Sequence, residues 1–395
     1  MLGVAPDFEH WLLEHGLHVR GIGAAHLSDG QRGIIALRAI TAGSVLLEVP
    51  GKLLMSANKS RHSPHLVPVL AACPGLSPTQ VLALHLLVEL ARGRASFWAA
   101  YLAQLPRAFT CLSYFSAHEA AALQVGHAVD VAREAAASVR AEWQGAASAL
   151  VLLESADLLP RRLCGLLAWR WAAATLASRA MHLPGDAAGA LAPFADLHNH
   201  RPSPGPDPPP VGALVPGEEA DAMDPRRQEV RDPACGSGDG CYHEAADVYR
   251  LTTHVRYAEG EQVFLCYGRH TNLDLLEHYG FLLEGNGHDR ALLPPGAFGA
   301  LEPGLAAAGL TPAGRWLHPG GLPCWALLHA LRVATAVPAE LARGGRGAAA
   351  AGAPISEDRD AAPGGRMACG LQEGAAGFNT SLQPGHEAFN RWRAQ

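Results

Sequence analysis

Strand-like and helix-like patterns of hydrophobic and polar residues occupy different parts of the chain. Residues 33–50 read GIIALRAITAGSVLLEVP, in which two runs rich in Leu and β-branched residues flank Thr41-Ala42-Gly43. This pattern predicts a strand, a turn and a second strand. Apolar residues then recur every three or four positions over 79–105 and 118–181, where Pro160 is the only proline. These two stretches are predicted to be helical.

Strand-like patterns return after the helical stretches. Val248 to Val255 and Gln262 to Tyr267 are short runs rich in β-branched and aromatic residues, and Glu259-Gly260-Glu261 lies between them. Turn residues in this position predict a hairpin. A short helix is predicted from Asn272 to Tyr279.

Two segments have compositions that do not support a packed core. Pro184 ends the helical stretch, and a Pro-rich run at 202–210 begins a polar segment that continues to about residue 240. Because proline can neither continue a helix nor donate in a sheet, this segment is predicted to be a mobile surface insert. Beyond Thr335 the chain is rich in Gly, Ala and Pro, and residues 336–395 are predicted to form a disordered tail.

The composition is that of a globular protein with a modest negative charge. The 395 residues are 49% hydrophobic, and the formal net charge is −6 with only 31 Lys and Arg. This charge disfavours direct binding to nucleic acid. The most apolar window, 163–177, contains Arg170 and is shorter than the ~20 residues that span a membrane, and the start lacks a signal-peptide pattern. A soluble protein with free thiols is expected, because the eight cysteines form no CxxC pair.

Three short motifs contain the residues that indicate a reaction. They are Gly30-Gln31-Arg32-Gly33, Asp196-Leu197-His198-Asn199-His200, and Tyr267-Gly268 followed by Glu277-His278-Tyr279-Gly280-Phe281. Each motif alone is more typical of a turn or a strand end. In this order, however, they resemble the SET-domain family of protein methyltransferases, in the branch typified by the Rubisco large-subunit methyltransferase and SET-domain-containing protein 4. The resemblance extends from about Leu17 to Val333 and is most specific in GEQVFLCYGRHTNLDLLEHYGFLLEGN.

The resemblance implies an α+β fold, the SET-domain fold of small curled β-sheets, interrupted by a helical insertion and followed by a short helical remnant. The implied organisation is an N-terminal part of the SET domain at 1–60, the helical insertion at 61–183, the C-terminal part of the SET domain at 184–286 with the insert at about 204–240, an abbreviated C-terminal helical region at 287–335, and the tail at 336–395. The strand, helix, strand order predicted from periodicity agrees with this division.

The resemblance also implies which residues form the site. The expected ligands of S-adenosylmethionine are Gly30, Gln31, Arg32, Arg179, Asn199, His200 and Tyr267. Tyr267 is also expected to be catalytic, and Asp196 and Tyr279 are expected to line the channel for the substrate lysine. Arg179 has a second interpretation, as an arginine that interacts with the dipole of its helix in the last turn. The motif at 30–33 departs from the family, whose members often show Gly-x-Gly at this place.

The implied chemistry needs alignment more than acid or base catalysis, and no metal ion. A methyl group on a sulfonium is already activated, so the protein mainly holds amine, methyl and sulfur in line. The lysine amine, with an ordinary pKa of about 10.4, must lose its proton before it attacks, and an apolar channel favours the neutral form. The hydroxyl of Tyr267 can accept weak C–H···O contacts from the methyl group.

Three other functions are compatible with some of the same residues. Asp196, His198 and His200 alternate along the chain, as metal ligands on one face of a strand do, which suggests a metal-dependent hydrolase; no HExxH motif accompanies them. A SET fold without catalysis is a second alternative, because a fold alone does not establish activity. Methylation of histidine, known from a related SET branch, is the third.

The expected partner is a protein substrate that presents a lysine, histone or non-histone, with the enzyme itself a monomer. Only 310–333, with Trp316 and Trp325, resembles the C-terminal domain that helps relatives choose their substrates. The expected location is the cytoplasm, the nucleus or both, with the plastid as a further option.

Overall fold

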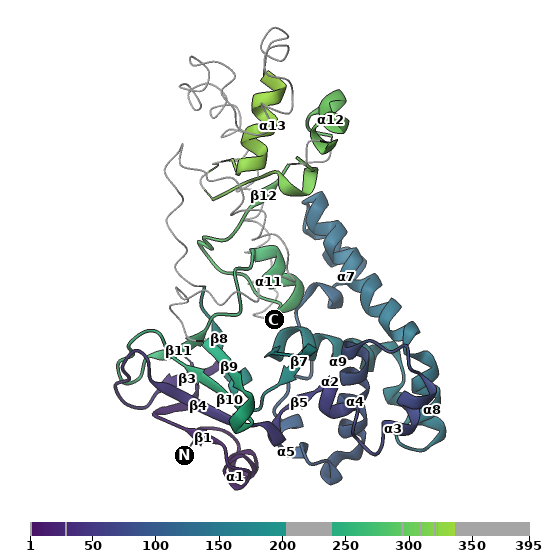
Figure 1. Ribbon diagram of the computed structural model, residues 1–395, viewed down its shortest axis with the longest axis vertical. Helices are drawn as coiled ribbons and strands as arrows, with labels where there is room; N and C mark the ends of the chain where they lie inside the picture. Colours follow the sequence, from purple (N-terminus) through teal and green to yellow (C-terminus); the bar gives the residue numbers. More distant parts are fainter. Residues whose placement is uncertain are drawn as a thin grey trace.

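The computed structural model describes residues 2–27, 30–202, 239–293, 296–307, 310–319, 321 and 323–335. Short β-sheets lie on one side of the molecule and a group of helices lies beside them, while the elements after residue 290 lie together at one end of the long axis (Figure 1). The mixture of small sheets and helices is the predicted α+β class.

Two four-stranded sheets contain most of the strands. The first has the order β1-β4-β10-β9 and consists of β1 (His18–Val19), β4 (Val45–Pro50), β10 (Val248–Thr252) and β9 (Asp239–His243). The second has the order β2-β3-β11-β8 and consists of β2 (Ile22–His26), β3 (Arg32–Ala36), β11 (Gln262–Leu265) and β8 (Asn199–His200). Both sheets therefore join the start of the chain to residues more than 150 positions later.

Two smaller sheets complete the β structure of the described residues. One consists of β5 (Met55–Ser56), β7 (Asp186–Leu191) and β6 (Ala180–Leu183), and the other consists of β12 (Ala291–Leu292) and β13 (Trp316–Leu317). The strands predicted within 33–50 are confirmed as β3 and β4. They lie in different sheets, however, because β3 pairs with β2 and β11 while β4 pairs with β1 and β10.

The hairpin predicted from Val248 to Tyr267 is wrong, although both of its strands exist. β10 pairs with β4 and β9, whereas β11 pairs with β3 and β8. The connecting residues bond instead to the turn after β3: Thr253 and Tyr257 exchange backbone hydrogen bonds with 40–44. Because that segment satisfies the backbone groups of the connection, the chain crosses from one sheet to the other and does not fold back on itself.

Helices occupy most of the stretches 79–105, 118–181 and 272–279, where the sequence predicts them, and further helices lie outside these stretches. The helical region contains α2 (Ala57–Ser60), α3 (Val67–Ala72), α4 (Pro78–Arg92), α5 (Ala99–Leu102), α6 (Ala117–Ala122), α7 (Gly126–Gly145), α8 (Ala147–Ser155) and α9 (Leu166–Arg179). Helix α1 (Pro6–Glu14) precedes the sheets, and α11 (Asn272–His278), α12 (Glu302–Ala307) and α13 (Trp325–Thr335) follow them. Helix α4 begins with a capping box, in which Ser77 and Gln80 bond each other's backbone N–H groups.

The sheets and most of the helical region share one hydrophobic core. Side chains such as Phe8 from α1, Leu47 from β4 and Leu84 from α4 belong to the same buried cluster. A second cluster joins α7 to α11 through Ala132 and Leu276. The helical region therefore supports the sheets directly, whereas residues 291–333 form small apolar clusters of their own.

The predicted insert at about 204–240 lies outside the described residues except for Asp239 and Gly240, which begin strand β9. The predicted tail at 336–395 lies outside them entirely. Among the helices of the described chain, none has the length and apolar character needed to span a membrane.

Candidate active site

Strands β3, β11 and β8 bring the three sequence motifs together. β11 runs antiparallel to β3, with Val263 opposite Ile34, and parallel to β8, with Phe264 opposite Asn199. Arg32 begins β3, Asn199 and His200 form β8, and Tyr267 follows β11 by two residues. The motifs at 30–33, 196–200 and 267–281 are therefore neighbours in space although they are far apart in sequence.

A buried cluster of charged residues lies where the helical region meets these strands. Arg179, at the end of α9, donates from Nη1 to the Asp196 backbone oxygen at 3.0 Å and to Asp196 Oδ2 at 3.1 Å. Asp196 Oδ2 also accepts from the hydroxyl of Tyr101 on α5, at 3.0 Å. The side chain of Asp196 is only 1% exposed. Arg32 lies close enough to interact electrostatically with all three residues.

The pKa values in this cluster report burial and charge. Burial is the largest single influence on Arg179 and acts to lower its pKa, but Asp196, Tyr101 and Tyr267 together outweigh it and the pKa is raised. Burial also lowers the pKa of Arg32, as does the like charge of Arg179. Burial raises the pKa of Tyr101, so its hydroxyl stays protonated and donates to Asp196. Two guanidinium groups thus lie near one carboxylate, and Arg32 makes its hydrogen bonds to Gln104.

An aromatic stack forms the other part of the site. The ring of Tyr267 lies between His200, with centroids 5.0 Å apart, and Tyr279, with centroids 4.9 Å apart, both in stacked geometry. Phe281 contacts both His200 and Tyr279 at tilted angles. The hydroxyl of Tyr267 donates to the His198 backbone oxygen at 2.5 Å. Burial raises the pKa of this hydroxyl well above its ordinary value, so it remains a neutral donor.

His200 in the stack and His198, two residues before it in the chain, are both neutral at physiological pH. His200 Nδ1 accepts a hydrogen bond from the Tyr267 backbone N–H at 3.0 Å, which an imidazolium cannot do. Burial, reinforced by the charge of His270, lowers the pKa of His200 to about 4. Burial likewise lowers the pKa of His198 to about 4, and its Nδ1 donates to the Ala195 backbone oxygen at 2.9 Å.

The glycines of the first motif have different surroundings. Gly30 has a φ of +78° in the turn between β2 and β3, and a Cβ there would meet nothing within 4 Å. Gly33 is tightly packed: a Cβ would lie 2.7 Å from Gln262 Nε2 and 2.9 Å from Asn199 Nδ2. Asn199 Nδ2 donates to the Arg32 backbone oxygen at 3.2 Å. A side chain at 33 would therefore have to displace the ends of Gln262 and Asn199, whereas glycine at 30 suits the backbone conformation.

The structure places the predicted site residues in two groups. Arg32, Arg179 and Asp196 belong to the charged cluster, and His200, Tyr267 and Tyr279 belong to the stack. Asn199 connects the stack side to β3, whereas Gly30 and Gln31 lie in the exposed turn before it. Their roles as ligands stay predictions. Arg179 occupies the last turn of α9, as the helix-dipole interpretation requires, and its Nη1 also contacts Asp196.

Sequence reasoning missed two neighbours of these groups. Tyr101 lies in the helical region, outside the three motifs, and only the fold reveals its bond to Asp196. His270 contacts the Tyr267 backbone oxygen at 3.0 Å and lies 5.7 Å from the Tyr279 ring. It stands three residues after Tyr267 in the most specific family segment, a position that could have drawn attention to it.

Two of the residues considered as metal ligands, Asp196 and His198, contact protein groups in the structure. Asp196 contacts Arg179 and Tyr101, and His198 Nδ1 is engaged by a backbone oxygen. In the part of the chain that the structure describes, no group of three or more His, Cys, Asp or Glu is arranged to hold a metal ion.

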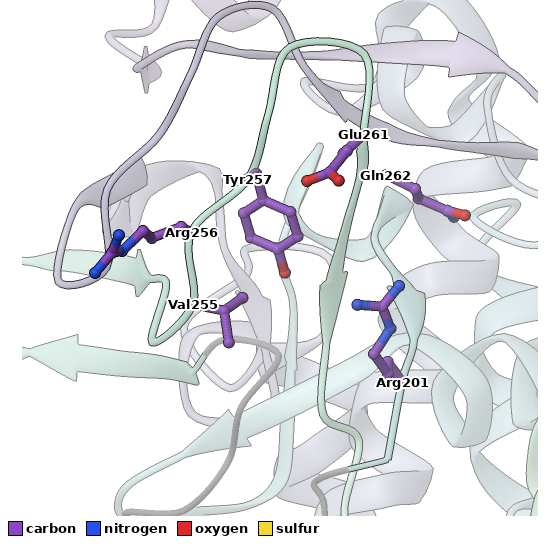
Figure 2. Close-up of a pocket in the computed structure, with 6 residues that line it drawn as sticks. All are labelled: Arg201, Val255, Arg256, Tyr257, Glu261 and Gln262. Atoms are coloured by element: carbon purple, nitrogen blue, oxygen red, sulfur yellow. The ribbon is translucent and has the colours of Figure 1, made fainter.

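A cavity of about 330 Å³ opens beside strand β11 and is lined by Arg201, Val255, Arg256, Tyr257, Glu261 and Gln262. None of the predicted site residues lines it. Arg201 extends toward Tyr257 and Glu261, while Arg256 points away from them (Figure 2). The guanidinium of Arg201 stacks 3.9 Å above the ring of Phe264. The charges around this cavity therefore do not converge on one point, unlike those around Asp196.

Known proteins resemble this chain in sequence and in structure. No family model matches the sequence. Protein SET DOMAIN GROUP 40 from Arabidopsis thaliana is 35% identical over 309 residues, which are 77% of this chain and 60% of that protein. Actin-histidine N-methyltransferase from Homo sapiens is 26% identical over 302 residues, 74% of this chain and 44% of that protein. The chain thus spans about half the length of these relatives.

Solved structures give the same result for the fold. Rubisco LSMT bound to sinefungin and monomethyllysine has a TM-score of 0.59, with 21% identity over 88% of this chain and 75% of that chain. Rubisco LSMT bound to AdoMet has a TM-score of 0.58, with 20% identity over 88% of this chain and 76% of that chain. The sequence similarity, the sheet order and the meeting of the three motifs lead to one conclusion. The chain has the SET-domain fold and resembles the SET-domain methyltransferases, as its motifs predict.

Proposed function

We propose that this protein is an S-adenosylmethionine-dependent protein methyltransferase that modifies a lysine side chain. The observation that carries the proposal is that the charged cluster and the aromatic stack meet. Asp196 belongs to the cluster, and the backbone oxygen of His198, two residues later, accepts the hydrogen bond from the Tyr267 hydroxyl. The charged cluster suits the zwitterionic end of the cofactor, and the aromatic stack suits an apolar channel for the substrate. Rubisco LSMT, which shares the fold, has been solved with AdoMet and with monomethyllysine.

The residues of the charged cluster fit the amino-acid end of the cofactor. Arg32 and Arg179 outnumber the single carboxylate of Asp196, so the cluster attracts a further anion. Arg179 Nε is buried and has no partner among the described residues. Buried donors without partners are uncommon and often indicate a ligand. Arg179 would hold the carboxylate of the cofactor, and the backbone around Arg32 and Asn199 would hold the remainder.

S-adenosylmethionine supplies a methyl group that its sulfonium makes reactive. The contribution of Tyr267 is positional, because its hydroxyl is fixed by the His198 backbone oxygen and its ring by His200 and Tyr279. Its raised pKa excludes a role as base at neutral pH. The hydroxyl oxygen keeps lone pairs that can accept C–H···O contacts. An apolar channel walled by these rings would lower the pKa of an entering amine and favour its neutral, nucleophilic form.

A second candidate is methylation of a histidine side chain. The actin-histidine N-methyltransferases align with 74% of this chain, nearly the share covered by SET DOMAIN GROUP 40. A flat imidazole would also suit a channel walled by stacked rings. The residue that is labelled distinguishes the two candidates.

Labelled S-adenosylmethionine tests the proposal directly. The protein is incubated with cytoplasmic, nuclear and plastid extracts, and the modified residue is located by mass spectrometry. We expect label on lysine, and Tyr267→Phe should reduce turnover roughly a hundredfold while it weakens cofactor binding much less, because alignment matters most in the transition state. Tyr242→Phe removes a hydroxyl from β9 that contacts Asp247, and this matched control should keep the parent rate.

Three outcomes would change the conclusion. Label on histidine would replace lysine by the second candidate. Equal rates for the parent and Tyr267→Phe would remove this residue from the mechanism. If the folded parent neither transfers label nor binds the cofactor in calorimetry, the methyltransferase proposal fails and a non-catalytic role is favoured.

A further inference from the structure

Tyr101 links the helical region to the charged cluster. It lies on α5, is 1% exposed, and its ring packs 6.2 Å from Phe8 of α1. Its hydroxyl reaches Asp196 Oδ2 at 3.0 Å, the same oxygen that accepts from Arg179 Nη1. The residue is thus held by packing on one side and directed at a single carboxylate oxygen on the other.

The contact between Arg179 and Asp196 is incomplete. A guanidinium and a freely placed carboxylate commonly form two parallel hydrogen bonds. Here Nη1 makes the contacts to Asp196, while Asp196 Oδ1 and Arg179 Nε are buried and lack partners among the described residues. Since Tyr101 holds Oδ2, it restrains rotation of the carboxylate that would bring both oxygens onto the guanidinium.

The charges explain why this restraint matters. Asp196 must lie near Arg179, because an isolated buried guanidinium next to Arg32 would be costly. A complete pair between Asp196 and Arg179 would, however, occupy the donors that a second carboxylate needs. The hydroxyl of Tyr101 stabilises an intermediate arrangement, in which Arg179 is oriented by Asp196 and still has hydrogen-bonding capacity left.

We propose that Tyr101 is a positioning residue, which acts through Asp196 to keep Arg179 available for the carboxylate of the bound cofactor. This inference rests on the proposed function and names a residue outside all three sequence motifs. It gives helix α5 a part in cofactor binding, in addition to Arg179 of α9. Tyr101 need not touch the cofactor or the reacting atoms.

Two ligands that differ in the amino-acid part test this role by calorimetry. S-adenosylhomocysteine carries the carboxylate, and 5′-methylthioadenosine lacks the whole amino-acid part. Tyr101→Phe keeps the ring and removes the hydroxyl, so it should weaken S-adenosylhomocysteine about tenfold, the size expected for one hydrogen bond to a charged group. Its affinity for 5′-methylthioadenosine should change less than twofold. In turnover, KM for the cofactor should rise while kcat stays near that of the parent.

Two matched variants separate positioning from packing. Tyr114 is a partly buried tyrosine elsewhere in the helical region, and Tyr114→Phe, which removes its hydroxyl, should change neither affinity. Phe8→Leu loosens the packing around the Tyr101 ring without removing its hydroxyl, so it should lower stability but preserve the ratio of the two affinities. In an Asp196→Asn background, adding Tyr101→Phe should change that ratio less than twofold, since no carboxylate remains to be restrained.

The outcomes separate this inference from the proposed function. If the parent binds neither ligand, the proposed function fails. If the parent binds both and Tyr101→Phe behaves identically, or loses both affinities equally, the positioning role is wrong while the proposed function stands. Should Tyr101→Phe not fold, a structure of the parent with S-adenosylhomocysteine decides: Tyr101 must still contact Asp196 while Arg179 contacts the ligand carboxylate. A carboxylate bound away from Arg179 overturns the inference.

Discussion

The charged cluster and the aromatic stack lie side by side but are built in different ways. The cluster takes one residue from each of four distant segments: Arg32 from β3, Tyr101 from α5, Arg179 from α9 and Asp196 from the turn before β8. The stack takes Tyr267, Tyr279 and Phe281 from one stretch of 15 residues and adds only His200 from β8. The cluster therefore depends on how the helical region docks on the sheets, whereas the stack depends mainly on local sequence.

Removal of the carboxylate should disrupt the cluster most strongly. Asp196→Ala leaves Arg179 buried beside Arg32 without a counter-charge, so the free energy of unfolding should fall by about 3–5 kcal/mol. Urea denaturation measures it. Asp130→Ala breaks the exposed pair with Arg133 on α7 and should cost less than about 1 kcal/mol. Equal losses in the two variants would show that the cluster contributes no more to stability than a surface pair.

The histidines at the junction of the two parts should make stability depend on pH. His200 has a folded pKa of about 4, below the ordinary 6.5, so the unfolded chain binds a proton first as the pH falls. The stabilisation is complete above about pH 6.5 and is lost as the pH approaches 4. Between pH 7 and pH 5 each such histidine should cost about 2 kcal/mol.

Variants assign this loss to particular histidines. His200→Gln should reduce the difference in unfolding free energy between pH 7 and pH 5 by about 2 kcal/mol. His85→Gln should do the same from within the helical region, because burial also lowers the pKa of His85 to about 4. Exposed His62→Gln should leave the difference unchanged. A parent protein equally stable at both pH values would contradict the assignment of neutral buried histidines.

A glycine ties the stack to the helical region. Gly280 has a φ of +77°, its carbonyl accepts from Thr110 Oγ1 at 2.7 Å, and a Cβ would lie 2.7 Å from the Thr110 backbone carbonyl carbon. Gly280→Ala should lower the unfolding free energy by about 2 kcal/mol. Gly260→Ala is the control, with a φ of +83° and open space, and should cost about 1 kcal/mol. Equal losses of unfolding free energy in the two variants would mean that Thr110 and Cys111 move away from a side chain at 280 at little cost.

The smallest effect should come from a segment that belongs to neither part. Replacement of residues 204–237 by a short Gly-Ser linker keeps all of strand β9 and should change the unfolding free energy by less than about 0.5 kcal/mol, because the composition of the segment cannot form a core. Chemical denaturation with a cooperative transition is expected for both proteins. Loss of that cooperativity would show that the segment is structural.

The difference between the two parts also explains what the sequence could predict. Local patterns identified strands β3, β4, β10 and β11 and the helices within 79–105, 118–181 and 272–279, because the alternation and the three-to-four spacing are local properties. They failed for the hairpin, since Thr253 and Tyr257 satisfy their backbone groups on residues 40–44 and no local pattern records that choice. The motif at 267–281 likewise contained nearly all of the stack. The resemblance to SET proteins, not the pattern, supplied the sheet arrangement.

The charged cluster could be predicted only in part from the sequence. Arg179 and Asp196 followed from the family motifs, but their mutual contact did not, and Asp196 was expected to line the substrate channel. Tyr101 was out of reach, because its significance arises only when α5 docks against the turn at 195–197. Partners in a buried charge network are determined by tertiary packing, which a single sequence does not display.

The parallel pairing of β8 with β11 has a consequence for how the protein folds. Asn199 and Phe264 meet directly although 65 positions separate them in the sequence. Contacts of such large sequence separation form slowly, because the chain entropy of closing the intervening loop is lost before the contact stabilises anything. Strand β11 also pairs with β3 from the start of the chain. The junction of cluster and stack should therefore assemble late, after the helices have formed, so that partly folded chains would have no functional site.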